Sequence, residues 1–415
     1  MRQAQFTVRS KEVQEHTATL LRDHVGLKET KKTKGKCTLA ILIHVVCAAA
    51  ARLTSIYAAG GQLKDAPSSE TVRTALLSTL PEYAKLQKGV NRALVADIPK
   101  ALRKRKQHIA IDLHLVPYYG QPFQDAKEIY RSQAKAGTHS FHAYASAYVI
   151  YHGQRFTVAL TPVEYCEDMK DVVQRLLTLA RKAGVRPSLL LLDRGFYSID
   201  VIRYLQCARV PFLMPAVARG RKPAANAPAK GIRAFQLWKR GGWGEHTLVA
   251  GKKKATVSIC VHCGNRRGKG RKGVKPKGKG KGKAKNRGRY AWVYAYWGIN
   301  PTSTRWVKET YRSRFGIETS YRQLNEARIK TCTRNPHVRF FFIAVALILR
   351  NVWVWLHWEL LSTPRRGRRR LRLERLRFKA MLLWLLHVAE SVLGTFDETF
   401  TERPSKFKVK NNRRA

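Results

Sequence analysis

The sequence predicts an α/β protein in which a mixed β-sheet is flanked by helices, preceded by a helical region and interrupted by a β-rich insertion. Apolar residues recur at helical spacing up to about residue 102, whereas short strand-like and helical stretches alternate from residue 108 onward. Leu189–Leu192 is apolar throughout, which is typical of a strand covered by helices on both faces. With 415 residues, the chain is long enough for two or three domains.

Residues 1–104 are expected to form a helical region. Residues 1–36 are charged and weakly patterned, which favours a short helix followed by a basic linker. Apolar spacing predicts one helix over Leu39–Tyr57, and Ser68-Ser69-Glu70 predicts the start of another, because serine is a preferred helix cap. The polar turn at 59–67 fits a DNA-binding helix-turn-helix and fits a plain helical bundle equally well.

Residues 105–219 alternate between the two kinds of element in the order strand, hairpin, helix, strand, helix, strand. The hairpin is expected at His152-Gly153-Gln154. This order predicts a mixed sheet with helices on its faces. The predicted strands are 108–117, 140–151, 155–161, 188–193 and 210–215, and the predicted helices are 169–183 and 198–208.

A β-rich insertion is expected over residues 220–299. It contains a Lys/Gly stretch at 264–288, which lacks the apolar residues needed to fold and is expected to be mobile. Residues 300–362 follow with a helix that begins near Thr302–Trp306 and a long apolar helix. A basic helical region and tail are expected over 363–415. The strands predicted in the insertion are 235–239, 247–250, 255–262 and 289–297, and the long helix is 338–361.

The charge of the chain indicates a polyanionic partner. There are 80 Lys+Arg against 27 Asp+Glu, giving a formal net charge of +53. Residues 264–289 hold 13 of these bases, so most of the charge lies elsewhere and is not confined to one tail. A pI of about 10.7 on a chain that is 44% apolar predicts a folded protein that binds nucleic acid.

The seven cysteines and the first residues favour the cytoplasm. Cys260 and Cys263 form a single CxxC without a second pair at zinc-ribbon spacing, so we expect a core role at a strand end instead of a metal site. The other cysteines are scattered, as expected for reduced thiols. The first 36 residues carry no recognisable secretion signal.

One apolar stretch could be a membrane-spanning helix by its length. Phe340–Leu361 is long enough to span a bilayer, but Arg350, Asn351, His357 and Glu359 interrupt it. A charged residue at mid-bilayer costs roughly 3 kcal/mol. We therefore expect a buried helix of a soluble protein and no membrane partner.

Two aspartates, Asp112 and Asp193, lie in predicted strands of the sheet. Asp112 alternates with Ile111 and Leu113, so it faces away from them, and a buried carboxylate of this kind is normally paired or bound to metal. A salt bridge to arginine is the alternative. Asp193 ends the apolar strand at 189–192; it could cap the next helix, but Ser198 stands closer to that helix and leaves Asp193 for another role.

A glutamate on a later helix completes the set. Tyr311, Arg314 and Glu318 are spaced i, i+3 and i+7, which places them on one helix face. Gly316 within this helix costs about 1 kcal/mol, which suggests a close backbone approach. A solvated face of ion pairs is the alternative, and Glu309 is the rival acid on the same helix.

Three clustered carboxylates require cations. Two like charges about 4 Å apart repel by roughly 4 kcal/mol at an effective dielectric near 20. Hard oxygen ligands select Mg²⁺ or Mn²⁺, and paired ions of this kind catalyse in-line displacement at phosphorus. The hypothesis from the residues alone is therefore a metal-dependent enzyme that acts on a nucleic acid backbone.

The ordered motifs IAID with Asp112, LLLLDRGFYS with Asp193, and Y-x2-R-x3-E with Glu318 resemble the DDE transposases of bacterial and archaeal insertion sequences. The resemblance covers roughly residues 105–360. It is closest to the group of the fourth insertion-sequence family, which carries a β-rich insertion between the second Asp and the Glu. It implies an RNase H-like core, with the catalytic core in two parts at 105–219 and 300–362, and a helical DNA-binding region in front.

The resemblance also implies roles for named residues. Asp112, Asp193 and Glu318 would be the catalytic metal ligands for Mg²⁺, with Mn²⁺ as a substitute. The family usually has Lys seven residues after the Glu, where this chain has Asn325. The expected DNA contacts are Tyr311, Arg314, Arg322, Arg194 and Lys330, with Arg328 as another base near Asn325.

The leading hypothesis is a cut-and-paste DNA transposase that works as a homodimer on terminal inverted repeats and target DNA in the prokaryotic cytoplasm, associated with the nucleoid. Two alternatives stay open. One is a metal-dependent nuclease of the same fold without strand transfer. The other is a non-catalytic DNA-binding protein derived from a transposase, for which the charge of +53 alone would serve.

Overall fold

The computed structural model describes residues 7–151, 154–219, 227–265, 289–362 and 374–396. Within these ranges, only the backbone is described for residues 151, 154, 265, 289–290 and 315–324. The predicted hairpin turn at 152–153, most of the Lys/Gly stretch, and most of the basic region at 363–415 lie outside the described residues.

The N-terminal part is helical, as its apolar spacing predicts. The predicted helix over Leu39–Tyr57 is wrong in one respect, because the structure breaks it into two. Leu53 adopts a left-handed conformation with φ 53°, and the Ser55 side chain then accepts a hydrogen bond from Ala58 N to begin the next helix. The elements are α1 (Ser10–Thr19), a π-helical turn (Leu20–Val25), a 3-10 turn (Lys31–Thr33), α2 (Leu39–Arg52), α3 (Ile56–Gly60), α4 (Ser69–Thr79), α5 (Tyr83–Ala96) and α6 (Lys100–Lys104).

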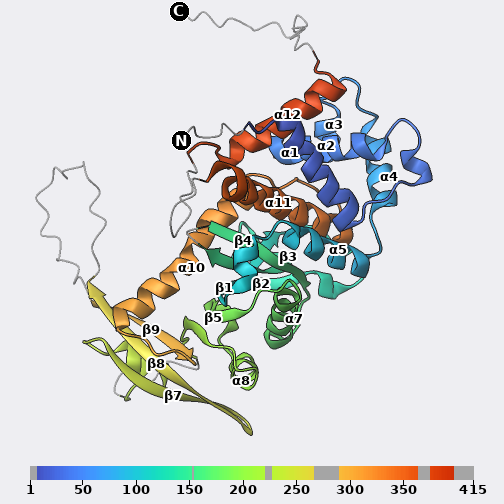
Figure 1. Cartoon of the computed structure of the whole chain (residues 1–415). Coiled ribbons are helices and arrows are strands. Elements are labelled where there is room, and N and C mark those ends of the chain that lie inside the picture. The colour runs from blue at the N-terminus through green and yellow to red at the C-terminus, as the bar shows by residue number, and fades with distance from the viewer. Residues whose placement is uncertain (1–6, 152–153, 220–226, 266–288, 363–373, 397–415) are drawn as a thin grey trace, which may run out of the picture.

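A mixed sheet occupies the centre of the molecule (Figure 1). Strand β1 (Gln107–Pro117) pairs antiparallel with β3 (Thr138–Tyr151) on one side and parallel with β5 (Pro187–Leu192) on the other. Strand β4 (Gln154–Val163) pairs with β3, and β6 (Phe212–Pro215) runs parallel to β5. The described strands therefore order as β4-β3-β1-β5-β6 through the middle of the sheet.

Strand β2 (Tyr130–Lys135) pairs with β3 and was not predicted. Its residues YRSQAK are mostly polar and none of the six is buried, so the sequence lacks the apolar alternation of a strand. The other predicted elements of this region are confirmed within a few residues, including α7 (Met169–Lys182) and α8 (Ile199–Cys207).

The two faces of the sheet border different cores. Ile109 and Ile111 of β1 join the large core formed with α5, α7 and α11, whereas Ala110 joins a smaller core under the start of α10. This division follows from the strand period of two. The smaller core comprises Ala110, Tyr148, Leu189, Leu191, Leu213, Cys260, Tyr294, Val307 and Tyr311.

Residues 242–297 add three antiparallel strands beyond β6: β7 (Gly242–Ala250), β8 (Lys253–Asn265) and β9 (Arg289–Trp297). Figure 1 shows this ribbon projecting away from the helical part of the molecule. The strand predicted at Phe235–Lys239 is wrong. Gly231, at φ 60°, turns the chain into a short helix, α9 (Ile232–Gln236), and Phe235 packs on Trp238.

Three helices complete the described fold: α10 (Thr304–Asn325), α11 (Pro336–Leu356) and α12 (Phe378–Leu393), with a π-helical turn at His357–Leu361 after α11. The stretch Pro336–Leu361 is long and apolar enough to cross a membrane, but 94% of its most apolar window is buried inside the protein. It is therefore a core helix, as predicted. In Figure 1, α10 runs from the β7–β9 ribbon toward α11.

Candidate active site

The pairing of β1 with β5 brings the two aspartates together. The parallel register ends at Ile111 opposite Leu192, so the next residues along the two strands are Asp112 and Asp193. Ala110 and Leu191, one step of alternation earlier, both belong to the smaller core under α10. Asp112 and Asp193 therefore lie next to each other on the face of the sheet that α10 covers.

Arg314 of α10 lies between the two carboxylates. Its Nη2 is 3.0 Å from Asp193 Oδ1 and its Nη1 is 3.7 Å from Asp112 Oδ1. The side chains of Arg314 and Asp112 are 8% and 13% exposed, whereas that of Asp193 is 40% exposed, so the site opens toward solvent on the Asp193 side. The salt-bridge alternative for Asp112 is thus realised, with an arginine that belongs to the same predicted site.

Aromatic rings surround Arg314. Its guanidinium carbon lies 5.3 Å from the centre of the Tyr311 ring, which packs in turn on Tyr294. Burial lowers the pKa of Arg314, but the neighbouring Tyr311, Asp193 and Asp112 outweigh it, so the net pKa is raised. Arg314 is therefore held as a permanent cation. Tyr311 is only 2% exposed, and its ring packs against Arg314.

Glu318 stands one helical turn after Arg314 on α10, which places the two residues on one face of the helix. The side chains of Glu318 and Arg322 are outside the described residues. The rival acid Glu309 is exposed and forms a 2.8 Å ion pair with Arg305 of the same helix. Nothing in the described contacts of Glu309 connects it to Asp112 or Asp193.

The other predicted contact residues fall in two places. Arg194 follows Asp193 directly and is exposed in a short 3-10 turn, Arg194–Phe196. Lys330 is not brought to the aspartates. Its backbone N–H donates to Thr54 O, and its side chain borders a cavity near the far end of β1, together with Val116 and Pro117.

Two predictions about local roles are confirmed. Ser198 caps α8 by accepting a hydrogen bond from Val201 N, and the Asp193 side chain makes no such cap bond. Cys260 is buried, which confirms its core role, although it lies within β8 and not at the strand end, and Cys263 is half-buried. Burial raises the pKa of the Cys260 thiol to about 12. Among the described side chains, no third His, Cys, Asp or Glu joins Asp112 and Asp193 in a group that could hold a metal ion.

Sequence reasoning missed two residues beside the site. Tyr148 of β3 is 5% exposed, and burial raises the pKa of its hydroxyl, with smaller effects from Arg155 and Arg314, which lower the pKa, and from Asp112, which raises it. Arg155 of β4 lies over the Tyr148 ring and donates a hydrogen bond to Ser313 O of α10. A correct prediction of the pairing register between β3 and β1 would have identified Tyr148, because Tyr148 pairs with Ala110.

The donor set suits a divalent metal. Asp112 and Asp193 supply hard oxygen donors from two rigid strands and already share one positive group, and the helix that carries Glu318 covers the same face. The described side chains therefore provide two of the three carboxylates predicted from the sequence.

Two neighbouring carboxylates, Asp112 within β1 and Asp193 directly after β5, define a candidate site for a metal-dependent enzyme. Comparison with known families makes this specific: the family described as transposase DDE domain matches residues 103–352. The chain belongs to the DDE transposases. Members of this family are enzymes that act on DNA and use divalent metal ions.

No curated protein sequence matches the chain. Among solved structures, the chain is similar to the piggyBac transposase in a cryo-EM structure of its synaptic complex with hairpin DNA. The TM-score is 0.46 at 10% sequence identity, and the alignment covers 92% of this chain and 77% of that one.

Proposed function

We propose that the chain is the transposase of an insertion sequence. It binds the terminal inverted repeats, cleaves DNA by metal-dependent phosphodiester hydrolysis and joins the freed 3′-OH ends to target DNA. It works as a homodimer in the prokaryotic cytoplasm. The observation that carries this proposal is the convergence of Asp112 and Asp193 on Arg314, a residue of the same helix that holds Glu318.

The strand order supports an RNase H-like core. The antiparallel strands β1, β3 and β4 lie on one side of the sheet, and the parallel strands β5 and β6 continue it beyond β1. The β7–β9 ribbon is then the insertion between the second Asp and the Glu. The N-terminal helices form the DNA-binding region.

Asp112, Asp193 and Glu318 would hold Mg²⁺, for which Mn²⁺ can substitute. Divalent ions held in this way activate an attacking oxygen and stabilise a leaving oxygen at phosphorus. Arg314 contributes a fixed positive charge where a scissile or flanking phosphate would lie, because it is buried and held by Tyr311. Arg194, Arg322 and Lys330 add contacts to the DNA backbone.

Strand cleavage by single-acid variants tests the proposal. The substrate is a supercoiled plasmid that carries the DNA flanking the coding region on both sides. Asp112→Asn, Asp193→Asn and Glu318→Gln should each abolish cleavage while leaving DNA binding intact or tighter. Glu309→Gln is the matched control, because Glu309 is an exposed acid on the same helix, and it should cut like the wild type.

The products separate the candidate functions. Joined ends support the transposase, and cut ends alone support a nuclease of the same fold. A chain that binds DNA but neither cuts it nor binds Mn²⁺ is a non-catalytic DNA-binding protein. A single acid variant that still cuts would remove that acid from the site.

A further inference from the structure

A groove with a volume of about 540 Å³ lies between the end of the first helical segment, α5 and α7. Apolar residues such as Val25, Val95 and Leu179 form part of its lining. The described residues that line it include no acid. We call this feature the basic groove, and its basic residues are Lys28, Lys85, Lys88, Arg92 and Lys182.

The α5 side of the basic groove is built by helix periodicity. Lys85, Lys88 and Arg92 are spaced i, i+3 and i+7 and are all exposed, so they form one stripe, while Leu86 and Val90 bury the opposite side of the helix. The stripe spans about 10 Å along the helix axis. One strand of DNA carries a phosphate every 3.4 Å or so along its axis, so the stripe matches about three phosphates.

A glycine fixes the other wall. A Cβ at Gly89 would lie 2.1 Å from the carbonyl oxygen of Val25, so only glycine allows the turn after the π-helical segment to approach α5 this closely. Lys28 follows Val25 by three residues and also lines the groove. The basic residues are therefore held together by backbone packing and not by chance side-chain conformations.

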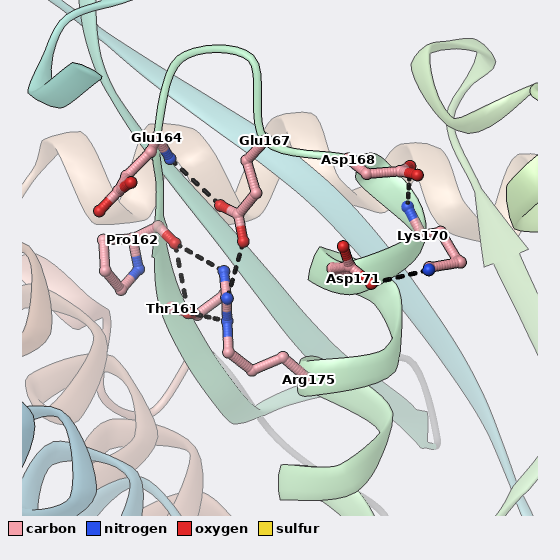
Figure 2. Close-up of polar contacts among 8 residues, drawn as sticks. All are labelled: Thr161, Pro162, Glu164, Glu167, Asp168, Lys170, Asp171 and Arg175. Atoms are coloured by element: carbon pink, nitrogen blue, oxygen red, sulfur yellow. Dashed lines mark hydrogen bonds and ion pairs between the residues drawn. The ribbon is translucent and has the colours of Figure 1, made fainter.

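The acids nearest along α7 are engaged elsewhere. Figure 2 shows the start of α7, where Glu167 pairs with Arg175 at 2.7 Å and Asp171 with Lys170 at 3.1 Å. The Asp168 side chain caps the helix by accepting from Lys170 N. None of the five bases of the basic groove forms an ion pair with a described residue. Five like charges held in one groove repel each other, which a polyanion relieves.

We propose that the basic groove binds the phosphate backbone of duplex DNA at a surface separate from the cleavage site. Helices α5 and α7 pack on the face of the sheet that carries the large core, whereas Asp112, Asp193 and α10 lie on the other face. The groove therefore holds DNA away from the reacting phosphate. This inference rests on the proposed function for the identity of the ligand, and it deepens the proposed role of the N-terminal helices by naming the surface that contacts DNA.

Salt-dependent binding of a 30-base-pair duplex to the full chain tests the groove. Each phosphate contact contributes about −0.9 to the slope of log K against log salt concentration. The triple variant Lys85→Ala, Lys88→Ala and Arg92→Ala should reduce the magnitude of the slope by about 2 to 3 and weaken binding more than about tenfold at 0.1 M salt. The control triple variant removes the same charge from exposed lysines outside the N-terminal helices, before β2, between β7 and β8, and on α12: Lys127→Ala, Lys252→Ala and Lys379→Ala.

The control should keep its slope within about one contact of the wild type. Equal losses in the two triple variants would overturn the proposal, because only diffuse charge would then matter. A slope unchanged by the groove variant would overturn it as well.

Lysine footprinting on the wild type avoids any folding defect of the variants. With DNA bound, Lys28, Lys85, Lys88 and Lys182 should be protected from acetylation, whereas Lys127, Lys252 and Lys379 should not. Unprotected groove lysines would refute the groove. Failure of the proposed catalytic function looks different, since it would appear as acid variants that still cut or a wild type that never cuts, with the footprint unchanged.

Discussion

Removing Arg314 should expose the repulsion between the two aspartates. At 3.7 Å and an effective dielectric near 20, the attraction between Arg314 and Asp112 is about 4 kcal/mol, part of which offsets the cost of burying both charges. The pair with Asp193 adds little because that carboxylate is 40% exposed. Loss of one partner of a buried pair typically costs about 3–5 kcal/mol. We expect Arg314→Met to destabilise the fold by about 3 kcal/mol in buffer free of divalent ions.

The assay is urea unfolding followed by tryptophan fluorescence, with EDTA and then with Mg²⁺. Mg²⁺ should stabilise Arg314→Met more than the wild type, because the carboxylates no longer share a guanidinium. Arg305→Met is the control, since its ion pair with Glu309 is fully exposed, and it should change neither value measurably. An Arg314→Met chain as stable as the wild type, or one that gains nothing extra from Mg²⁺, would contradict the bridging role of Arg314.

Three further predictions concern the fold around the site. The Asn351 side chain of α11 accepts a hydrogen bond from Thr157 N and donates to Thr157 O and Leu94 O. Asn351→Ala should therefore lower the free energy of unfolding by about 3 kcal/mol in chemical denaturation. A loss below about 1 kcal/mol would show that these bonds contribute little. Burial, with a smaller contribution from Arg339, lowers the pKa of His142 from 6.5 to about 4. The unfolded chain then binds the extra proton first, so stability is full above about pH 6.5 and falls toward pH 4, by about 2 kcal/mol at pH 5. His142→Gln should lose that part of the pH dependence in unfolding curves at pH 7 and 5, and an unchanged difference would contradict the assignment. Gly89→Ala places a Cβ 2.1 Å from a backbone oxygen and should lower the free energy of unfolding by about 3 kcal/mol, whereas a neutral effect would show that the turn moves freely.

Most of the sheet could be predicted because its strands are apolar and their ends are marked. The apolar run Leu189–Leu192 and the apolar residues that alternate around Asp112 both indicated strands of the sheet. Ser198 indicated the start of α8. Strand β2 could not be predicted, since its pairing with β3 depends on tertiary contact and not on its polar residues. The break at Leu53 was missed for a related reason: a leucine at φ 53° is set by packing and has no sequence signal of its own.

The candidate site was predicted in part. The motifs identified Asp112 and Asp193 and the helix face with Arg314, and the structure joins these three. The bridging position of Arg314 was not predicted, because helix spacing fixes a face but not the partner across it. Lys330 was placed near the site by its distance along the chain from Glu318, yet the chain leaves α10 at Asn325 and carries Lys330 to the loop after α2.

The most direct test of the account locates the metal. Fe²⁺ can occupy a Mg²⁺ site built from carboxylates, and with ascorbate and peroxide it cuts the nearby backbone. A metal site shared by the three acids predicts cuts near residues 112, 193 and 318 that excess Mg²⁺ suppresses. Cuts confined to other segments, or a pattern that lacks the region of residue 318, would contradict the shared metal site.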